Sequence, residues 1–168
     1  MPPTQKTIIG VMGPGEGATE NDKAAAFTLG KLIAEQGWVL LSGGRDCGVM
    51  DASCKGAKSA GGLTIGILPG TTRAGMSDAV DIPIITGTGN ARNAINVLSC
   101  DAIIGCGMGA GTASEVALAL KSDKFVILLN NDEISQRFFR SLAKNAQLEY
   151  ANSPQQAVAL IKQKLSEK

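Results

Sequence analysis

The residues best suited to bind an anion lie in one glycine-rich segment, Cys106–Glu115, which reads Cys-Gly-Met-Gly-Ala-Gly-Thr-Ala-Ser-Glu. Gly107, Gly109 and Gly111 stand at alternate positions, where the absence of Cβ atoms lets several backbone amides gather. A helix expected to start at Thr112 would add unpaired N–H groups and the positive end of its dipole. The segment therefore predicts an anion pocket, most naturally for a phosphate.

Two side chains of this segment could take part in chemistry. Thr112 could cap the expected helix and also offer its hydroxyl to the anion. Glu115, three residues later, would complete a capping box. Glu115 could instead be a functional carboxylate in the site. The spacing alone leaves both roles of Glu115 open.

The sequence contains no histidine. This excludes Ser-His-Asp and Cys-His nucleophile arrangements, and it removes the usual acid or base of neutral pH. The four cysteines, Cys47, Cys54, Cys100 and Cys106, show no Cys-x-x-Cys spacing, so no protein metal site is expected. Cys54 and Cys100 read as buried thiols, whereas Cys47 and Cys106 adjoin glycine turns and could face a ligand.

Apolar runs alternate with helical patterns along the whole chain. The expected strands are 6–12, 38–41, 63–68, 82–86, 101–105, 124–129 and 147–151, and the expected helices are 21–36, 46–60, 91–99, 112–121, 134–145 and 154–165. This alternation predicts an α/β fold, a Rossmann-like doubly wound parallel sheet of about seven strands flanked by helices. Residues 1–168 are expected to form a single ligand-binding domain.

Glycine clusters follow the expected strands at 13–17, 43–44, 70, 87–89 and 107–111. In an open parallel sheet these turns meet at the carboxyl edge, where ligands bind. Gly13 opens a loose Gly-x-Gly-x-x-Ala dinucleotide fingerprint. The second strand, however, ends in Ser42-Gly43-Gly44-Arg45 without the acid that holds an NAD ribose, which disfavours NAD. NADP, with Arg45 on its 2′-phosphate, remains a minor alternative, and Ser42–Gly44 reads as a second anion-binding turn.

Arginine and asparagine side chains could complete the anion site. Asn90 and Arg92 fall near the start of the expected helix 91–99, where the helix dipole disfavours a cation. An Arg92 that points into the cleft would therefore call for an anion. Arg73 lies in the long irregular stretch 71–81, where it could reach an anion or remain a solvated surface residue.

Composition excludes several classes of partner. The net charge is +1, with 16 basic and 15 acidic residues, and no basic tract suggests nucleic acid. No apolar run approaches the roughly 20 residues of a membrane span. The N-terminus shows no signal peptide, so a cytoplasmic location is expected. Small, apolar helices on both sheet faces, with few aromatics, predict a homo-oligomer.

These motifs resemble the Rossmann-like Lonely Guy (LOG) family of lysine decarboxylase-like proteins. The family motif Pro-Gly-Gly-x-Gly-Thr-x-x-Glu aligns with Gly107–Glu115, and the family's upstream arginine aligns with Arg92. Ser42-Gly43-Gly44, followed by Gly48-Val-Met-Asp-Ala and Gly56-Ala57, is similar to the family's second-strand loop and next helix. In the enzymes of this family the matching arginine and glutamate release a nucleobase from a nucleoside 5′-monophosphate. The resemblance thus implies Arg92 and Glu115 as a catalytic pair.

The sequence departs from the enzyme pattern beside both residues. Gly107-Met108 replaces Pro-Gly, and Asn93 replaces a lysine. Within the wider family this form more closely resembles the molybdenum cofactor carrier proteins, small homo-oligomers that hold the pterin cofactor without transforming it.

The first interpretation is therefore a non-enzymatic protein that binds, stores and protects the molybdenum cofactor (molybdopterin) for transfer to molybdoenzymes, as a dimer or tetramer. The alternative is a nucleoside 5′-monophosphate phosphoribohydrolase of the cytokinin riboside monophosphate activating type. NADP-dependent oxidoreductase and lysine decarboxylase chemistry are disfavoured, since the ribose-binding acid and a Schiff-base lysine motif are missing. The expected binding residues are Gly13, Ser42, Gly43, Gly44, Arg73, Asn90, Arg92, Gly107, Met108, Gly109, Ala110, Gly111, Thr112 and Glu115.

Overall fold

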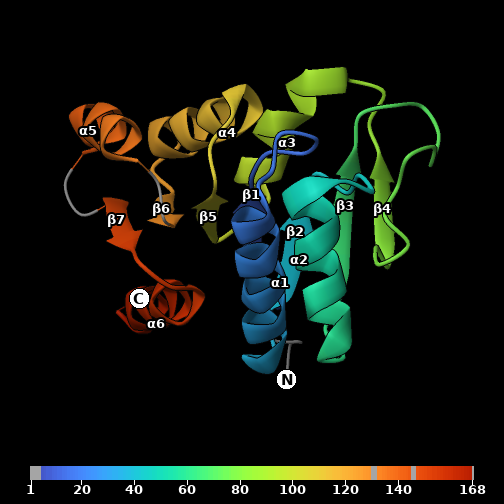
Figure 1. Cartoon of the computed structure of the whole chain (residues 1–168), viewed down its shortest axis with the longest axis horizontal. Helices are drawn as coiled ribbons and strands as arrows, with labels where there is room; N and C mark the ends of the chain where they lie inside the picture. The colour runs from blue at the N-terminus through green and yellow to red at the C-terminus, as the bar shows by residue number, and fades with distance from the viewer. Residues whose placement is uncertain (1–4, 130–131, 145–146, 168) are drawn as a thin grey trace.

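The computed structural model describes residues 5–129, 132–144 and 147–167. Its centre is a parallel seven-stranded sheet in the order β4-β3-β2-β1-β5-β6-β7 (Figure 1). The strands are β1 (Ile8–Met12), β2 (Val39–Ser42), β3 (Thr64–Leu68), β4 (Ile82–Ile85), β5 (Ala102–Cys106), β6 (Phe125–Leu129) and β7 (Leu148–Ala151).

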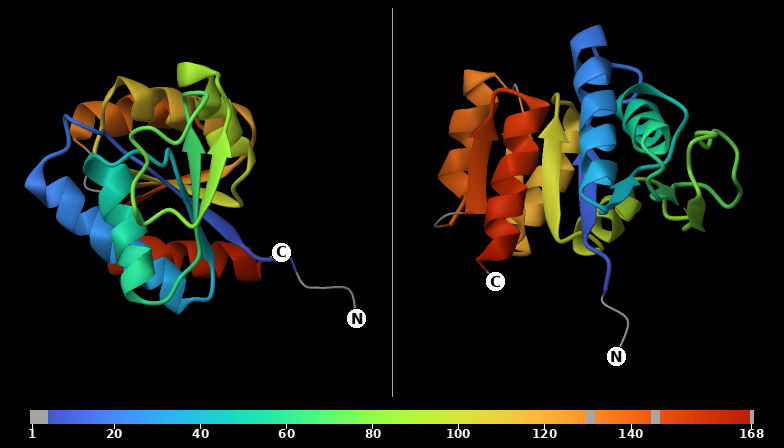
Figure 2. Two further views of the ribbon diagram at one scale, coloured as in Figure 1. Left: turned by 90° about the vertical axis from the view of Figure 1, so that its right-hand side faces the viewer. Right: turned by 90° about the horizontal axis from the view of Figure 1, so that it is seen from below.

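Helices cover both faces of this sheet, as Figures 1 and 2 show. One face carries α1 (Glu20–Glu35), α2 (Gly48–Ser59) and α6 (Pro154–Ser166). The other carries α3 (Arg92–Leu98), α4 (Ala110–Lys121) and α5 (Glu133–Leu142), with the short 3₁₀ helix η1 (Gly89–Ala91) before α3. The predicted doubly wound α/β fold is therefore confirmed. The helix expected over 134–145 ends at Leu142, because Ala143 has an extended backbone conformation, and residue 145 lies outside the described residues.

The central strands are apolar on both faces because each face lies under helices. All five residues of β5 are buried, and so are the last four of β1 and of β6. Ile104 packs into the core beneath α1, together with Leu29 and Ile33. Ile103 packs into the core beneath α4, together with Val116. These strands therefore lack an alternation of apolar and polar residues. Their sequences are continuous apolar runs, which can be recognised without the structure.

Helices α1 and α2 cross at unusually close range. A Cβ atom on Gly30 would collide with the carbonyl oxygen of Ser53, and one on Gly56 would collide with the carbonyl oxygen of Phe27. Gly30 and Gly56 therefore let the two helices approach each other closely.

The capping box expected at Thr112 and Glu115 was wrong. Helix α4 begins at Ala110 with Gly109 as its N-cap residue, and no side chain caps it. The carbonyl oxygen of Gly109 accepts the first helical hydrogen bond, from Ala113 N at 2.8 Å. Thr112 is thus the third helical residue. A capping box does form at α1, between Thr19 and Asp22.

The sheet order creates a crevice between β1 and β5. The chain builds outward from β1 to β4 and then returns to place β5 on the other side of β1. The turns after these two strands lead to α1 and α4, which lie on opposite faces (Figure 2). Such a switch point is where open α/β sheets bind ligands. Among the described residues no helix has the length and apolar character needed to cross a bilayer.

Candidate ligand-binding site

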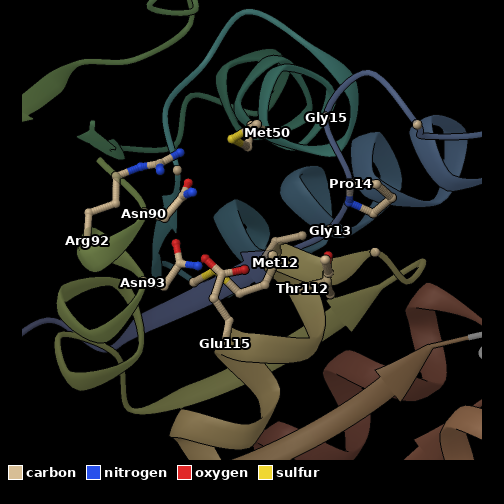
Figure 3. Close-up of a pocket in the computed structure, with 16 residues that line it drawn as sticks. Met12, Gly13, Pro14, Gly15, Met50, Asn90, Arg92, Asn93, Thr112 and Glu115 are labelled. Carbon is tan, nitrogen blue, oxygen red and sulfur yellow. The ribbon is translucent and has the colours of Figure 1, made fainter. Parts of the chain in front are cut away.

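A cavity of about 330 Å³ opens at this switch point (Figure 3). Loops after β1 and β2 form one side of it, and the first turns of α3 and α4 form the other. The predicted residues that line it are Gly13, Gly43, Asn90, Arg92, Gly109, Ala110, Gly111, Thr112 and Glu115. The structure therefore brings together residues from four segments that are far apart in the sequence.

The N-terminus of α4 supplies the cavity with polar groups that lack partners. The amides of Ala110, Gly111 and Thr112 precede the first intrahelical hydrogen bond and are free of intrahelical acceptors. Thr112 is only 2% exposed, and its Oγ1 makes no hydrogen bond with any residue that the structure describes. An orphaned hydroxyl beside a helix N-terminus is costly unless a ligand satisfies it, and the helix dipole favours an anion there.

Arg92 provides a positive charge in the wall of the cavity. Its side chain is 8% exposed, and Nε donates to the carbonyl oxygen of Ile67 at 2.9 Å while Nη1 donates to that of Gly89 at 3.3 Å. Burial lowers its pKa, and Arg45 adds to this, while Glu115 opposes it. Nη2 faces Gly43, where a Cβ atom would lie 3.2 Å from it. The backbone thus fixes the guanidinium while its charge stays available.

Glu115 faces the same cavity, close to Asn93 in Figure 3. The carboxylate is 7% exposed, and its Oε1 accepts a hydrogen bond from Asn96 Nδ2 at 2.7 Å. Burial raises the pKa of Glu115 to about 7, although the Asn96 bond and the Arg92 charge act in the opposite direction. Of the two roles left open by the spacing, the structure excludes the cap. Glu115 is a buried acid that changes charge near neutral pH.

Ser42 and Gly44 were predicted to bind the ligand but serve the turn after β2. The fully buried Ser42 Oγ accepts from Gly44 N at 3.0 Å and lies 3.4 Å from Cys54 Sγ. Gly44 has a φ of 76°, and a Cβ atom there would lie 2.8 Å from Gly66 Cα. Neither residue lines the cavity; between them, Gly43 does.

Three other predicted residues also lie outside the cavity wall. Gly107 adopts a φ of 76° beside the Asp22 carboxylate, which a Cβ atom would approach to 2.8 Å. Met108 packs against the core beneath α4. Arg73 is exposed on the loop between β3 and β4. Their separation from the cavity reflects side-chain and turn geometry that glycine spacing does not encode.

Several lining residues were missed by the sequence argument. Pro14, Gly15 and Gly17 belong to the fingerprint loop, so their glycine spacing was a usable signal. Asn93 adjoins Arg92, and its Nδ2 donates to Ser114 Oγ at 2.8 Å. The remaining lining residues are Val11, Met12 and Met50, whose apolar types carried no signal that could separate them from the core.

The cysteines do not contribute to the cavity wall. Cys106 points to the other side of the turn, where its Sγ donates to the Asp22 carbonyl oxygen at 3.5 Å, and burial raises its pKa to about 12. Cys47, which is partly exposed, lies near Gly15 but lines a neighbouring groove. Within the described ranges no cluster of three histidine, cysteine, aspartate or glutamate side chains is placed to hold a metal ion.

Comparison with solved structures identifies close relatives along nearly the entire chain. The molybdenum cofactor binding protein of Rippkaea orientalis is 58% identical, with a TM-score of 0.94 over 97% of this chain and 99% of that one. A structure of the molybdenum cofactor carrier protein of Chlamydomonas reinhardtii is 52% identical, with a TM-score of 0.91 over 96% and 99% of the two chains.

Sequence comparison identifies a further relative. An uncharacterized protein of Archaeoglobus fulgidus is 51% identical over 121 residues, which cover 72% of this chain and 78% of that protein. The solved structures confirm the resemblance to molybdenum cofactor carriers. The model of the SLOG cluster4 family matches residues 6–158, and the chain belongs to this family.

Proposed function

We propose that this protein binds, stores and protects the molybdenum cofactor and delivers it to molybdoenzymes. The observation that carries the proposal is the anion site at the switch point, in a chain 50–58% identical to carriers over nearly its full length. The cofactor is cargo here, and the protein supplies a shaped cavity rather than a reactive group.

The cavity residues suit the chemistry of this cargo. The free amides of Ala110 and Gly111 and the orphaned Thr112 Oγ1 would receive the terminal phosphate. Arg92 would balance the remaining negative charge, because no carboxylate forms an ion pair with it in the part of the chain that the structure describes. The polar edge of the pterin would meet Asn90 and the backbone at Gly43, while its metal arrives inside the cofactor.

We further propose that the carrier is a cytoplasmic homo-oligomer. Cys47, Cys54, Cys100 and Cys106 are free thiols, which agrees with a reducing compartment. Helices α3 and α5, which cover the same sheet face, expose large apolar side chains that a second copy would shield: Ile95, Leu98, Ile134, Phe138 and Leu142.

Recovery of the cofactor with the protein tests the proposal. The chain is purified without oxygen from a host that makes the cofactor, and bound pterin is then oxidised and measured by fluorescence. We expect stoichiometric pterin for the unaltered chain and at least a tenfold loss in Arg92→Gln, because a charged hydrogen-bonding partner is removed. Arg73→Gln removes an arginine outside the cavity and should leave the yield unchanged. A protein that never carries pterin would refute the proposal.

One observation keeps the phosphoribohydrolase as a second candidate: Arg92 and Glu115 do share one cavity. The hydrolase needs an ionised glutamate to stabilise an oxocarbenium-like transition state, whereas burial raises the pKa of Glu115 to about 7. Incubation with AMP or isopentenyladenosine monophosphate separates the two functions. Rapid release of free base that disappears in Glu115→Gln would establish the hydrolase and displace the carrier.

A further inference from the structure

We infer that Glu115 binds the cargo in its protonated form, so that above neutral pH a proton enters the cavity with the cargo and leaves with it. The inference rests on the proposed carrier function and deepens it by naming how loading responds to pH. It follows from the position of this buried acid inside an anion site.

The surroundings of Glu115 offer little support to its negative charge. On its own helix, α4, Thr112 faces the same cavity with an uncharged hydroxyl. From α3, Asn96 donates one hydrogen bond and Arg92 contributes a positive charge without forming an ion pair. Beyond the end of α3 lies Cys100, a buried thiol whose pKa lies far above its usual value.

Among the described residues, β1 and α2 place no charged side chain in the cavity wall that could neutralise the Glu115 carboxylate. β1 contributes Met12, and α2 contributes Met50. The charge of Arg45 acts on Arg92, whose pKa it lowers. The ionised carboxylate is consequently stabilised by the hydrogen bond from Asn96 and by the positive charge of Arg92.

An anionic cargo changes this balance in one direction. A phosphate held at the α4 N-terminus would repel an ionised Glu115 and attract Arg92, which weakens the support for the carboxylate. The unbound acid already has a raised pKa of about 7, so cargo would push it higher and draw a proton from solvent. Because Asn96 bonds to Oε1, the proton would reside on Oε2 and could be donated to an acceptor atom of the cargo.

This proton uptake also separates binding from hydrolysis. A protonated Glu115 donates a hydrogen bond but cannot stabilise developing positive charge at a sugar carbon. The same acid that would serve a hydrolase as a carboxylate therefore serves a carrier as a neutral donor. Affinity should fall as pH rises, which provides a means of release at higher pH.

The test measures dissociation constants for molybdopterin released anaerobically from a purified molybdoenzyme, by equilibrium dialysis from about pH 6 to about pH 8.5. For the unaltered chain we expect binding to weaken roughly tenfold per pH unit above about pH 7. Glu115→Gln keeps the shape of a protonated acid, so it should lose this slope and show only the pH dependence that the cargo phosphate itself contributes. The difference between the two proteins removes the titration of the cargo phosphate, which both share.

Glu35→Gln is the matched control, because Glu35 is an exposed residue at the far end of α1. It should reproduce the unaltered curve. Calorimetry at about pH 8 in two buffers of different ionisation enthalpy counts protons directly. We expect the unaltered chain to take up nearly one proton more than Glu115→Gln, because the unbound acid is mostly ionised at that pH. Equal pH curves and equal proton counts would overturn this inference alone. Absence of binding at every pH would overturn the carrier function and this inference with it.

Discussion

Gly109 controls access to the free amides of α4. It adopts an extended conformation, with a φ of −155°, and a Cβ atom there would make an ordinary contact with Pro14 Cβ at 3.6 Å. The position therefore accepts a Cβ atom without backbone strain, but Gly109 lines the cavity, so a larger side chain would take up space beside the free amides. Gly109→Val should abolish cargo binding while lowering the free energy of unfolding by only about 1 kcal/mol, through the poorer N-cap.

Pterin recovery and urea denaturation check this expectation together. Gly70→Val is the matched control, because Gly70 lies outside the cavity and a Cβ atom there would come no closer than 3.9 Å to its neighbours. It should leave binding intact. Full cargo binding by Gly109→Val would mean that the ligand does not use the α4 amides.

Glu115 should also make the stability of the empty protein depend on pH. Its folded-state pKa of about 7 lies above the ordinary value of 4.5, so the folded chain binds more protons than the unfolded chain between these values. Stability from the protonated acid is fully present below about pH 4.5 and is lost as pH rises through about 7. The loss amounts to about 3 kcal/mol at alkaline pH, from about 1.4 kcal/mol per pKa unit.

Denaturant titrations at several pH values isolate this contribution by comparing the unaltered chain with Glu115→Gln. The variant should gain stability relative to the unaltered chain as pH rises from about 5 to about 8, because it has no charge to bury. Parallel stability curves for the two proteins would show that Glu115 titrates alike in the folded and unfolded chains.

The α1–α2 contact holds α2 where Met50 can line the cavity. The backbone of Phe27 occupies the space that a side chain on Gly56 would need. Gly56→Ala must therefore separate two packed helices, and overpacking of this kind costs about 1–3 kcal/mol or more. We expect a lower denaturation midpoint and, since α2 moves, weaker cargo binding.

Gly111→Ala provides the opposite outcome for the same chemical change. Gly111 lies in the first turn of α4 and is exposed, with no atom within 4 Å of an added Cβ. Alanine there should raise the free energy of unfolding by about 0.5 kcal/mol. Equal effects at the two glycines, measured by urea denaturation, would mean that close packing does not limit the α1–α2 contact.

The elements themselves could largely be read from the sequence. Apolar runs located the seven described strands. The central strands are continuously apolar because they are buried on both faces, and the edge strand β4 is apolar although it is largely exposed. The start of α4 was misplaced because Thr112 matched a capping pattern, whereas Gly109 gave no side-chain signal. The contact between Gly56 and α1 could not be predicted either, because a small residue indicates a close contact without identifying the segment that makes it.

The molecule as a whole was more predictable than the wall of its site. Strand–helix alternation fixes a parallel sheet, and the glycine turns then collect at its carboxyl edge. Which residues of those turns face the cavity depends on turn geometry: Gly43 faces it, while the adjacent Ser42 and Gly44 hold the turn. The buried position and raised pKa of Glu115 arise only from tertiary packing.

The exposed apolar side chains on α3 and α5 make assembly testable at the scale of the whole molecule. Ile134 is 82% exposed in the first turn of α5, and Leu98 is 58% exposed at the end of α3. A charge at either residue should cost the isolated subunit little, because both side chains contact mainly solvent, but it would be desolvated in an interface between copies.

We expect the unaltered chain to behave as a dimer or tetramer in light scattering. The double variant Ile134→Glu, Leu98→Glu should form smaller species with an unchanged circular dichroism spectrum. Leu63→Glu places the same charge on an exposed leucine outside that helical layer and should leave the assembly intact. A single-subunit mass for the unaltered chain, or an unchanged mass for the double variant, would show that this helical face is not where copies meet.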